Sequence, residues 1–320
     1  MAVRKVLLIG GSGFVGGWLA SRLSAAGIRV TIPTRRRENR KGLLLLPTVF
    51  EVQADVNEPQ ALAHLVEGVD AVINLVGILH DRDDREPFGA AFAAAHVELP
   101  RQIVAAMRAA GVRRLLHMSA LKAASDAPSA YLRSKAAGEA VVLEASDLDV
   151  TLFRPSVIFG PGDVFLNTFA SLLRHVPVLP LAGGDARLQP VFVGDVADAF
   201  VAALSDTASF GHIYELGGPR VYTLRDLVRY VAELGGRQRV IIDLPPGIAG
   251  VQARVLGWLP NPPLTPDNLR SLSVPSVTDG YRNPPGWQPH ALEAVAPGYL
   301  APLRLHQRLG FYRSRAGRGT

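Results

Sequence analysis

The chain of 320 residues contains no cysteine. A protein without thiols has no disulfide framework, no cysteine nucleophile and no cysteine-ligated zinc site. Because oxidising and reducing compartments both tolerate such a chain, the redox surroundings stay open. Thiol chemistry is therefore excluded from every functional hypothesis that follows.

Long apolar runs and aromatic clusters are also missing. No segment approaches the roughly 20 uninterrupted apolar residues that a membrane-spanning helix needs. Basic residues are scattered and no stripe of aromatic side chains accompanies them, which argues against nucleic-acid binding. The 34 Lys and Arg exceed the 28 Asp and Glu, and the net charge of +6 alone suits an anionic ligand, a membrane face or a nucleic acid.

A glycine-rich turn follows the first apolar run, residues 6–9, and precedes a stretch that is compatible with a helix. Such a turn brings backbone N–H groups and the positive end of a helix against a pyrophosphate. The alternative is a strand-to-helix turn without a ligand, but a strand before and a helix after the glycines favour nucleotide binding. The candidate contacts in this turn are Gly10, Ser12, Gly13, Phe14, Val15 and Gly16.

The first 20 residues also resemble a signal peptide, because Arg4 and Lys5 precede an apolar stretch. Five glycines interrupt that stretch at a nucleotide-binding spacing, and no small-residue cleavage site follows them. We therefore expect an intracellular, cytoplasmic protein that is at most peripheral to the inner membrane.

Strand-like and helix-like segments alternate along the first half of the chain, which predicts βαβ units. Some strand segments, such as residues 71–76, are apolar almost throughout, as is typical of a parallel sheet covered on both faces. The predicted fold class is α/β, a Rossmann-type doubly wound parallel sheet with a smaller, discontinuous substrate lobe. Predicted strands are 6–9, 28–32, 49–53, 71–76, 114–118 and 150–153; predicted helices are 14–26, 59–67, 92–110 and 131–145.

Proline and glycine become frequent after Arg154, where we expect the substrate lobe to begin. Residues 190–200 indicate a short strand and a helix that return to the first lobe. The expected division assigns residues 1–154 and 190–210 to the nucleotide-binding lobe, 155–189 and 211–310 to the substrate lobe, and 311–320 to a basic flexible tail.

Tyr131 and Lys135 stand four residues apart at the start of a predicted helix, which puts both side chains on one face. Ser119 ends the preceding strand. We expect the lysine ammonium to lower the pKa of the phenol from its ordinary value of about 10, and the serine hydroxyl to hold a substrate oxygen. A tyrosine and a lysine at this spacing also occur by chance, but Ser119 and the glycine turn favour catalysis.

A basic run that contains Arg35 and Arg36 follows the second predicted strand, and the first acid after it is Glu38. NAD sites place an acidic residue there, whereas the 2′-phosphate of NADP needs an arginine. We predict NADP as the cofactor, bound by Arg35 and Arg36, with NAD as the alternative. A solvated basic loop remains the other interpretation.

Histidines and carboxylates give no convincing metal signal. Residues 80–85 follow the fourth predicted strand and alternate acid with base, so we interpret them as a solvated loop and predict no metal site. His96, His117 and His175 are interpreted as packing or hydrogen-bonding residues.

With these motifs the chain resembles a short-chain dehydrogenase/reductase of the extended or atypical kind, in the NAD-dependent epimerase/dehydratase superfamily. The resemblance covers most of the chain and implies an oxidoreductase or epimerase whose catalytic set is Ser119, Tyr131 and Lys135, with Lys135 also on the nicotinamide ribose. Ser119 lies only twelve residues before Tyr131, closer than in extended members, which predicts a short loop over the substrate. The further cofactor contacts that it implies are Asp55, Val56, Leu75, Val76, Gly77, Pro155, Val157 and Ile158.

A narrower resemblance, to the nucleotide-binding accessory subunit family of respiratory complex I and its bacterial relatives, involves residues 73–80, 116–121, 131–135 and 159–163. In that family the bound cofactor is regarded as structural. Two hypotheses follow: an NADP(H)-dependent oxidoreductase or epimerase, and a non-catalytic accessory or assembly protein of a membrane respiratory complex.

The substrate lobe is mostly apolar, as in residues 164–166 and 179–181, with Arg187 and Gln189 as polar anchors. This composition indicates a lipid-like or quinone-like small-molecule substrate. Residues 248–259 are apolar with one arginine and too short to span a bilayer, so they form either a core helix or an interfacial helix. Nothing in the sequence indicates an oligomeric state.

Overall fold

The structure is a computed structural model that describes residues 3–35, 43–83, 85–236, 238–258, 262, 264–280 and 282–301. Within these residues, seven strands form one sheet in the order β11-β6-β5-β4-β1-β2-β3, and every neighbouring pair is parallel. This arrangement confirms the predicted Rossmann-type α/β fold. The strands are β1 (Lys5–Ile9), β2 (Arg29–Thr34), β3 (Val49–Gln53), β4 (Ala71–Asn74), β5 (Arg114–Met118), β6 (Asp149–Pro155) and β11 (Ile213–Leu216).

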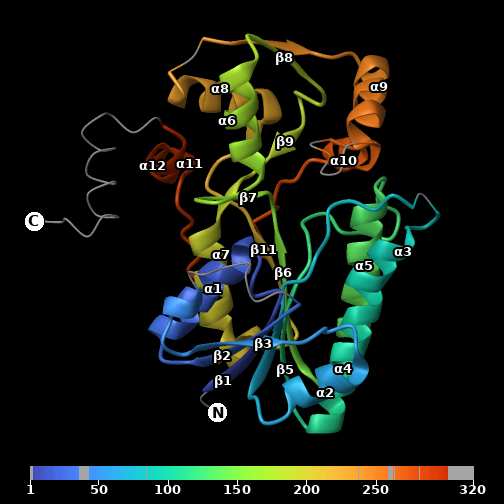
Figure 1. Cartoon of the computed structure of the whole chain (residues 1–320), viewed down its shortest axis with the longest axis vertical. Coiled ribbons are helices and arrows are strands. Elements are labelled where there is room, and N and C mark those ends of the chain that lie inside the picture. Colours follow the sequence, from blue (N-terminus) through green and yellow to red (C-terminus); the bar gives the residue numbers. More distant parts are fainter. Residues whose placement is uncertain are drawn as a thin grey trace, which may run out of the picture.

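Helices cover both faces of this sheet (Figure 1). The side chains of Val6 and Leu8 of β1 enter the core on one face, whereas Leu7 and Ile9 enter the core on the other, which explains why the strand is apolar throughout. On the first face lie α1 (Phe14–Ala25) and α7 (Val193–Leu204); on the second lie α2 (Pro59–Val66), α4 (Leu99–Ala110) and α5 (Ala130–Leu143).

The predicted helix 92–110 is divided into three parts. It begins with α3 (Ala90–Ala93), widens into one π-helical turn, η3 (Ala94–Glu98), and continues as α4. Pro100 has no N–H to donate back into the helix. The carbonyl oxygen of His96 instead lies against α5, where a Cβ on Gly138 would come within 2.0 Å of it. Glycine at this position is what allows the two helices to approach so closely.

A second, smaller lobe has its own apolar core. In it β8 pairs in parallel with β13, and β9 pairs with β12 in the antiparallel sense, while β7 pairs with β10 beside the main sheet. The strands are β7 (Ile158–Phe159), β8 (Val178–Leu181), β9 (Arg187–Leu188), β10 (Val191–Phe192), β12 (Tyr222–Thr223) and β13 (Val240–Asp243). The helices are α6 (Phe165–His175), α8 (Leu224–Leu234), α9 (Pro246–Gly257), α10 (Pro266–Leu272), α11 (Leu292–Val295) and α12 (Pro297–Leu300), and the 3-10 turns η2 (Leu43–Leu45) and η4 (Thr207–Ser209) lie in the first lobe.

The boundary between the lobes differs from the expected one at a single strand. Residues 190–210 return to the first lobe through β10 and α7, but β11 then continues there as the edge strand beside β6. The first lobe therefore extends to Leu216 rather than to residue 210. The predicted basic tail, 311–320, lies outside the described residues. Among the helices that the structure describes, none is long and apolar enough to cross a bilayer.

Candidate functional site

The predicted site residues gather at the carboxyl ends of β1, β4, β5 and β6. The sheet order places β1 between β2 and β4. From β1 the chain adds β2 and β3 on one side and then returns to add β4, β5 and β6 on the other, so the order of the strands reverses beside β1. In open α/β sheets, ligands bind in the crevice at such a switch point.

The glycine turn after β1 is shaped by close backbone contacts. The N–H of Gly13 donates to the carbonyl oxygen of Gly10 (3.0 Å), and a Cβ on Gly16 would lie only 2.5 Å from that same oxygen. No side chain caps the start of α1, whose N-cap is Gly13. The first N–H groups of the helix are thus available to an anionic ligand.

The second group of predicted cofactor residues borders this turn. A Cβ on Gly10 would lie 3.1 Å from the backbone of Leu75 and Val76, so these residues pass directly beside the glycine turn. Arg35 follows the end of β2 and is exposed. Asp55 follows the end of β3 and accepts hydrogen bonds from the backbone N–H (3.0 Å) and the side-chain amide (2.7 Å) of Asn57. Val56 is half-buried beside Asp55. Arg36 lies outside the described residues.

Lys135 is buried and its ammonium lies at the end of β5. Its Nζ donates to the carbonyl oxygen of Met118 (2.7 Å) and lies 3.8 Å from the position that a Cβ on Gly77 would take. Burial lowers the pKa of Lys135 to about 8, while the nearby carboxylate of Glu139 opposes that change. The structure thus brings Lys135 together with Gly77 and with the residue that precedes Ser119.

Ser119 is 3% exposed, and its N–H donates to the carbonyl oxygen of Phe153 (2.7 Å). Its hydroxyl has no hydrogen-bond partner among the described residues. Buried polar groups in folded proteins are nearly always paired, so an orphaned buried hydroxyl requires an explanation. A bound ligand at the end of β5 would supply the missing partner.

Tyr131 begins the first turn of α5 and packs against the small cluster of Ala120, Ala127 and Leu132. Burial raises the pKa of its phenol to about 12. The direction is opposite to the expected lowering by Lys135, and burial is its cause. The phenol is therefore neutral at ordinary pH.

A chain of hydrogen bonds joins the loop after β4 to Tyr131 through His96. Ile78 N–H donates to His96 Nε2 (3.1 Å), His96 Nδ1 lies 2.8 Å from Ser134 Oγ, and this hydroxyl donates to the carbonyl oxygen of Tyr131 (2.7 Å). Burial and the positive charge of Lys135 lower the pKa of His96 to about 3, so the ring is neutral and donates from Nδ1. His96 is a hydrogen-bonding residue, as predicted, and it also contacts the Tyr131 ring edge-on at 5.8 Å.

Three charged residues that the sequence analysis did not assign to the site are linked near Lys135: Glu139 and Glu215 are buried, and Arg154 is partly buried. Arg154 of β6 binds Glu139 of α5 through two hydrogen bonds (2.8 and 2.5 Å), and Glu215 of β11 lies opposite Arg154 in the sheet register. Glu139 is four residues after Lys135, so the i, i+4 spacing could have indicated it. Arg154 and Glu215 come together only through the sheet.

The end of β6 leads back over the glycine turn. Leu121 N–H donates to the carbonyl oxygen of Pro155 (3.0 Å), and the N–H of Val191 donates to that of Val157 (3.0 Å). Beyond Ile158, which lies in β7, a Cβ on Gly162 would approach the ring of Phe14 to 3.9 Å. Pro155 therefore lies beside the segment that follows Ser119, and the loop beyond Ile158 passes the start of α1 at Gly162.

The loop of residues 80–85, interpreted from sequence as solvated, has a structural role. Asp81 accepts the N–H of Phe92 (2.9 Å) and Asp83 accepts the N–H of Ala90 (3.0 Å), so both carboxylates cap the start of α3. In the part of the chain that is described, no group of three or more His, Asp or Glu side chains could hold a metal ion.

The parallel sheet, its switch point beside β1 and the glycine turn after that strand define a Rossmann-type dinucleotide-binding fold. Residues 6–217 match the model of the NAD dependent epimerase/dehydratase family, and the chain belongs to this family.

Two similar proteins have names that indicate different functions. The chain is 32% identical over 260 residues to "NADH dehydrogenase [ubiquinone] 1 alpha subcomplex subunit 9, mitochondrial" of Arabidopsis thaliana, a match that covers 79% of this chain and 63% of the relative. This chain thus spans less than two thirds of that relative's length. It is also 32% identical over 256 residues to "Ceramide reductase" of Caulobacter vibrioides, covering 79% of this chain and 78% of the relative.

Among solved structures, UDP-glucose 4-epimerase of Thermotoga maritima superimposes with a TM-score of 0.70 at 17% identity, covering 92% of this chain and 97% of the epimerase. At that identity the likeness concerns the fold alone.

Proposed function

We propose that this protein is an NADP(H)-dependent oxidoreductase that reduces the carbonyl group of an apolar, lipid-like or quinone-like substrate. The observation that carries the proposal is the orphaned, buried hydroxyl of Ser119 at the end of β5. Lys135 donates to the carbonyl oxygen of Met118, the residue before Ser119, and Tyr131 packs against Ala120, the residue after it. These three side chains have the roles of a hydrogen-bond donor, a cation and an acid at one reacting oxygen.

The residues that border the crevice suit a dinucleotide. The uncapped start of α1 would hold the pyrophosphate, and Lys135 would bind the nicotinamide ribose. Arg35, exposed after β2, would bind the 2′-phosphate, which supports NADP over NAD because a guanidinium fork pairs well with phosphate. Asp55, Val56, Leu75, Val76 and Gly77 would line the rest of the cofactor, together with Pro155, Val157 and Ile158.

When bound, the reduced cofactor supplies a hydride. The phenol of Tyr131 supplies the proton to the substrate oxygen, and Ser119 Oγ donates a hydrogen bond that holds this oxygen in place. A phenol kept neutral by burial suits the direction in which a carbonyl gains a proton. The product is an alcohol, and the phenolate left on Tyr131 then recovers a proton from water.

The substrate class rests on two exposed apolar side chains, of which the sequence analysis named only Val164. Leu166, Leu179 and Leu181 are buried in the core of the second lobe, and Gln189 binds the backbone of Thr278 and Gly218. Leu79 and Val164, by contrast, expose 57% and 76% of their surfaces, two residues beyond Gly77 and Gly162 respectively. Apolar surface at both edges of the crevice favours a lipid-like ligand, and the relative named ceramide reductase supports the same class.

The test is consumption of NADPH with a panel of carbonyl compounds, in which long-chain 3-keto lipids and quinones are compared with UDP-sugars. We expect turnover with the apolar compounds and none with the Tyr131→Phe protein. Turnover confined to UDP-sugars would refute the substrate class, and equal turnover by Tyr131→Phe would refute the mechanism.

A second candidate function is a non-catalytic accessory role at a membrane respiratory complex. It is favoured by a stripe on α9 where Ile248, Val251, Val255 and Trp258 expose 56%, 58%, 65% and 91% of their surfaces. The helix carries no acid and one arginine, Arg254, as interfacial helices do. The Arabidopsis relative, named as a subunit of NADH dehydrogenase, supports the same direction.

Two variants separate these functions in a cell-based assay of respiratory-complex assembly. If the cofactor is structural, Gly16→Val disrupts assembly by blocking the pyrophosphate turn, whereas Tyr131→Phe leaves assembly and every metabolite unchanged. If the protein is an oxidoreductase, Tyr131→Phe changes the metabolites.

A further inference from the structure

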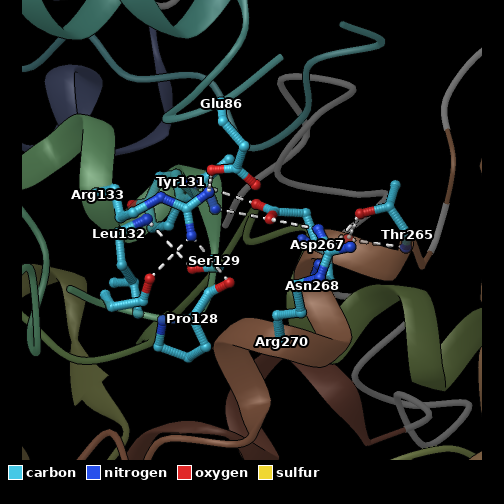
Figure 2. A network of polar contacts seen from close by, with 12 residues as sticks. Glu86, Pro128, Ser129, Tyr131, Leu132, Arg133, Thr265, Asp267, Asn268 and Arg270 are labelled. Atoms are coloured by element: carbon cyan, nitrogen blue, oxygen red, sulfur yellow. Dashed lines mark hydrogen bonds and ion pairs between the residues drawn. The ribbon is translucent and has the colours of Figure 1, made fainter. Parts of the chain in front are cut away.

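The helix that carries Tyr131 is capped from two parts of the chain. Ser129, its N-cap, accepts the N–H of Leu132 (3.2 Å). The carboxylate of Asp267 accepts the N–H of Ala130 (2.8 Å) with one oxygen and the N–H of Tyr131 (3.0 Å) with the other. Figure 2 shows Asp267 reaching from α10 toward the first turn of α5.

The contact supplies a charge that α5 lacks. Helices commonly carry an acidic residue in their first turn, where it offsets the partial positive charge of the free N–H groups, but α5 has none. Asp267 also lies in the first turn of α10, which is closed by a capping box of Thr265 and Asn268. One carboxylate thus lies at the starts of two helices, and its side chain is 18% exposed.

α10 is part of the second lobe in its packing. Leu272 packs against the core of that lobe, and a Cβ on Gly183 would contact Leu272 at 3.3 Å and Leu269 at 4.0 Å. The apolar side of α10 therefore packs in the second lobe, whereas Asp267 at its start binds the first lobe. Arg270, the cation on the same helix, is 3.7 Å from Asp267 and largely exposed, so it competes weakly for the carboxylate.

Tyr131 is consequently held by its backbone from both lobes. Its carbonyl oxygen accepts the hydroxyl of Ser134, which His96 links to the loop after β4. Its N–H is held by Asp267. Arg133, the next residue but one, binds the carbonyl oxygens of Pro87 and Ala127, which fixes the loops on either side (Figure 2).

We propose that Asp267 is a positioning residue that sets Tyr131 in place only while α10 of the second lobe is docked on α5. The proposal rests on the proposed function, in which Tyr131 gives the substrate a proton. A movement of the second lobe that withdraws Asp267 removes two acceptors from the first turn of α5. The tyrosine side chain then loses its fixed direction, and docking of the lobe restores it.

The first measurement is amide hydrogen exchange in the Asp267→Asn protein. An asparagine side chain carries no charge and has one oxygen, so it cannot offer the separate acceptor atom that each N–H group has in Asp267. We expect exchange at Ala130 and Tyr131 to accelerate by roughly tenfold or more, with no change at Leu132, which Ser129 holds. Asp185→Asn is the matched control, because Asp185 is an exposed acid of the second lobe that pairs with Arg225.

The second measurement does not depend on turnover. Ultraviolet difference titration of each protein against its Tyr131→Phe counterpart isolates this phenol, and we expect its pKa to fall from about 12 toward the ordinary value of 10 in Asp267→Asn. With an active substrate, we expect kcat to fall roughly tenfold while KM and the Kd of NADPH stay within twofold. Asp267→Glu, which restores both oxygens and the charge, should recover part of each effect.

The outcomes separate the two proposals. Unchanged exchange at Ala130 and Tyr131, or an unchanged phenol pKa in Asp267→Asn, overturns the positioning role whether or not the protein turns over. Faster exchange with an unchanged kcat also overturns it. Absence of turnover in the unmodified protein, with exchange and phenol pKa both altered by Asp267→Asn, refutes the oxidoreductase function and leaves the positioning of Tyr131 by α10 in place.

Discussion

The ammonium of Lys135 donates a hydrogen bond to the carbonyl oxygen of Met118, over 2.7 Å, and so lies against the residue that precedes Ser119. This contact fixes a cation at the carboxyl end of β5, within reach of the backbone at Gly77. The sequence analysis paired the lysine with Tyr131, but the backbone of β5 is the partner that holds it.

The pH dependence of cofactor binding follows from the burial of this lysine. The pKa of Lys135 is lowered from 10.5 to about 8, so the ammonium predominates below pH 7, is half lost at about pH 8 and is largely absent above pH 9. We expect the affinity for NADPH to be constant between pH 6 and pH 7 and to fall above pH 8. We expect Lys135→Met to bind NADPH weakly at every pH, and a Kd that still rises above pH 8 in this variant would assign the effect to another group.

Tyr131→Phe and Lys135→Ala should differ in which of two properties they impair, turnover or NADPH binding. The phenol hydroxyl serves only the proton transfer, so Tyr131→Phe should abolish turnover and leave NADPH binding nearly intact. Lys135→Ala should impair both, because the ammonium also serves the ribose. Fluorescence titration of NADPH and a turnover assay on the same preparations measure the two effects; weak NADPH binding by Tyr131→Phe would contradict the division of roles.

Arg35 should decide the choice between the two dinucleotides. A charge-assisted hydrogen bond to the 2′-phosphate contributes about 1.5–3 kcal/mol, so Arg35→Ala should weaken NADPH binding by about tenfold or more and leave NADH binding unchanged. Arg29→Ala, at the opposite end of β2, serves as the control. Equal affinities of the unmodified protein for NADPH and NADH would remove the basis of the assignment.

The glycine turn should not tolerate a methyl group. Gly16→Ala places a Cβ 2.5 Å from the carbonyl oxygen of Gly10, and relief of that clash should cost about 1–3 kcal/mol of stability and most of the affinity for NADPH. Gly250→Ala, inside α9 with nothing within 4 Å of the new Cβ, should stabilise by up to about 1 kcal/mol. Chemical denaturation of both variants gives the comparison, and a Gly16→Ala protein as stable as the unmodified one would contradict the geometry.

The stripe on α9 should bind anionic lipid. Val251→Asp introduces a carboxylate into the middle of the stripe, and we expect it to reduce co-flotation with liposomes of phosphatidylglycerol and phosphatidylcholine at low salt. Leu45→Asp changes an apolar residue of the first lobe that is even more exposed, at 83% against 58% for Val251, and should leave flotation unchanged. If the unmodified protein does not float, α9 is not a lipid-binding helix.

The strand bounds and helix ends that could be predicted from the sequence depend on patterns within a few neighbouring residues. β3 and β5 were predicted with their observed bounds, because an apolar strand between turn residues is a local pattern. Gly111 ends α4 in the left-handed conformation, at the position expected for a helix end. The start of α5 could have been placed at Ser129, since a serine before a helix is a common N-cap.

The remaining features depend on contacts between distant segments. Gln189 was predicted as a substrate anchor, but its side-chain amide binds Thr278 and Gly218, which no local pattern connects to it. The strand β11 is short and is recognised as part of the main sheet only through its pairing with β6. The local sequence places Asp267 at the start of α10. Its hydrogen bonds to the first turn of α5 depend on how the two lobes pack.

The acceptor of the Ala130 N–H lies 137 residues further along the chain. Translation at about 5–20 residues per second releases α5 from the ribosome on the order of ten seconds before Asp267 follows. During that interval the nascent helix has Ser129 as its only described cap, and the peptide groups of Ala130 and Tyr131 hydrogen-bond to water. The order of synthesis therefore completes the cap of α5 only after every strand of the main sheet, β1 to β6 and β11, has been made.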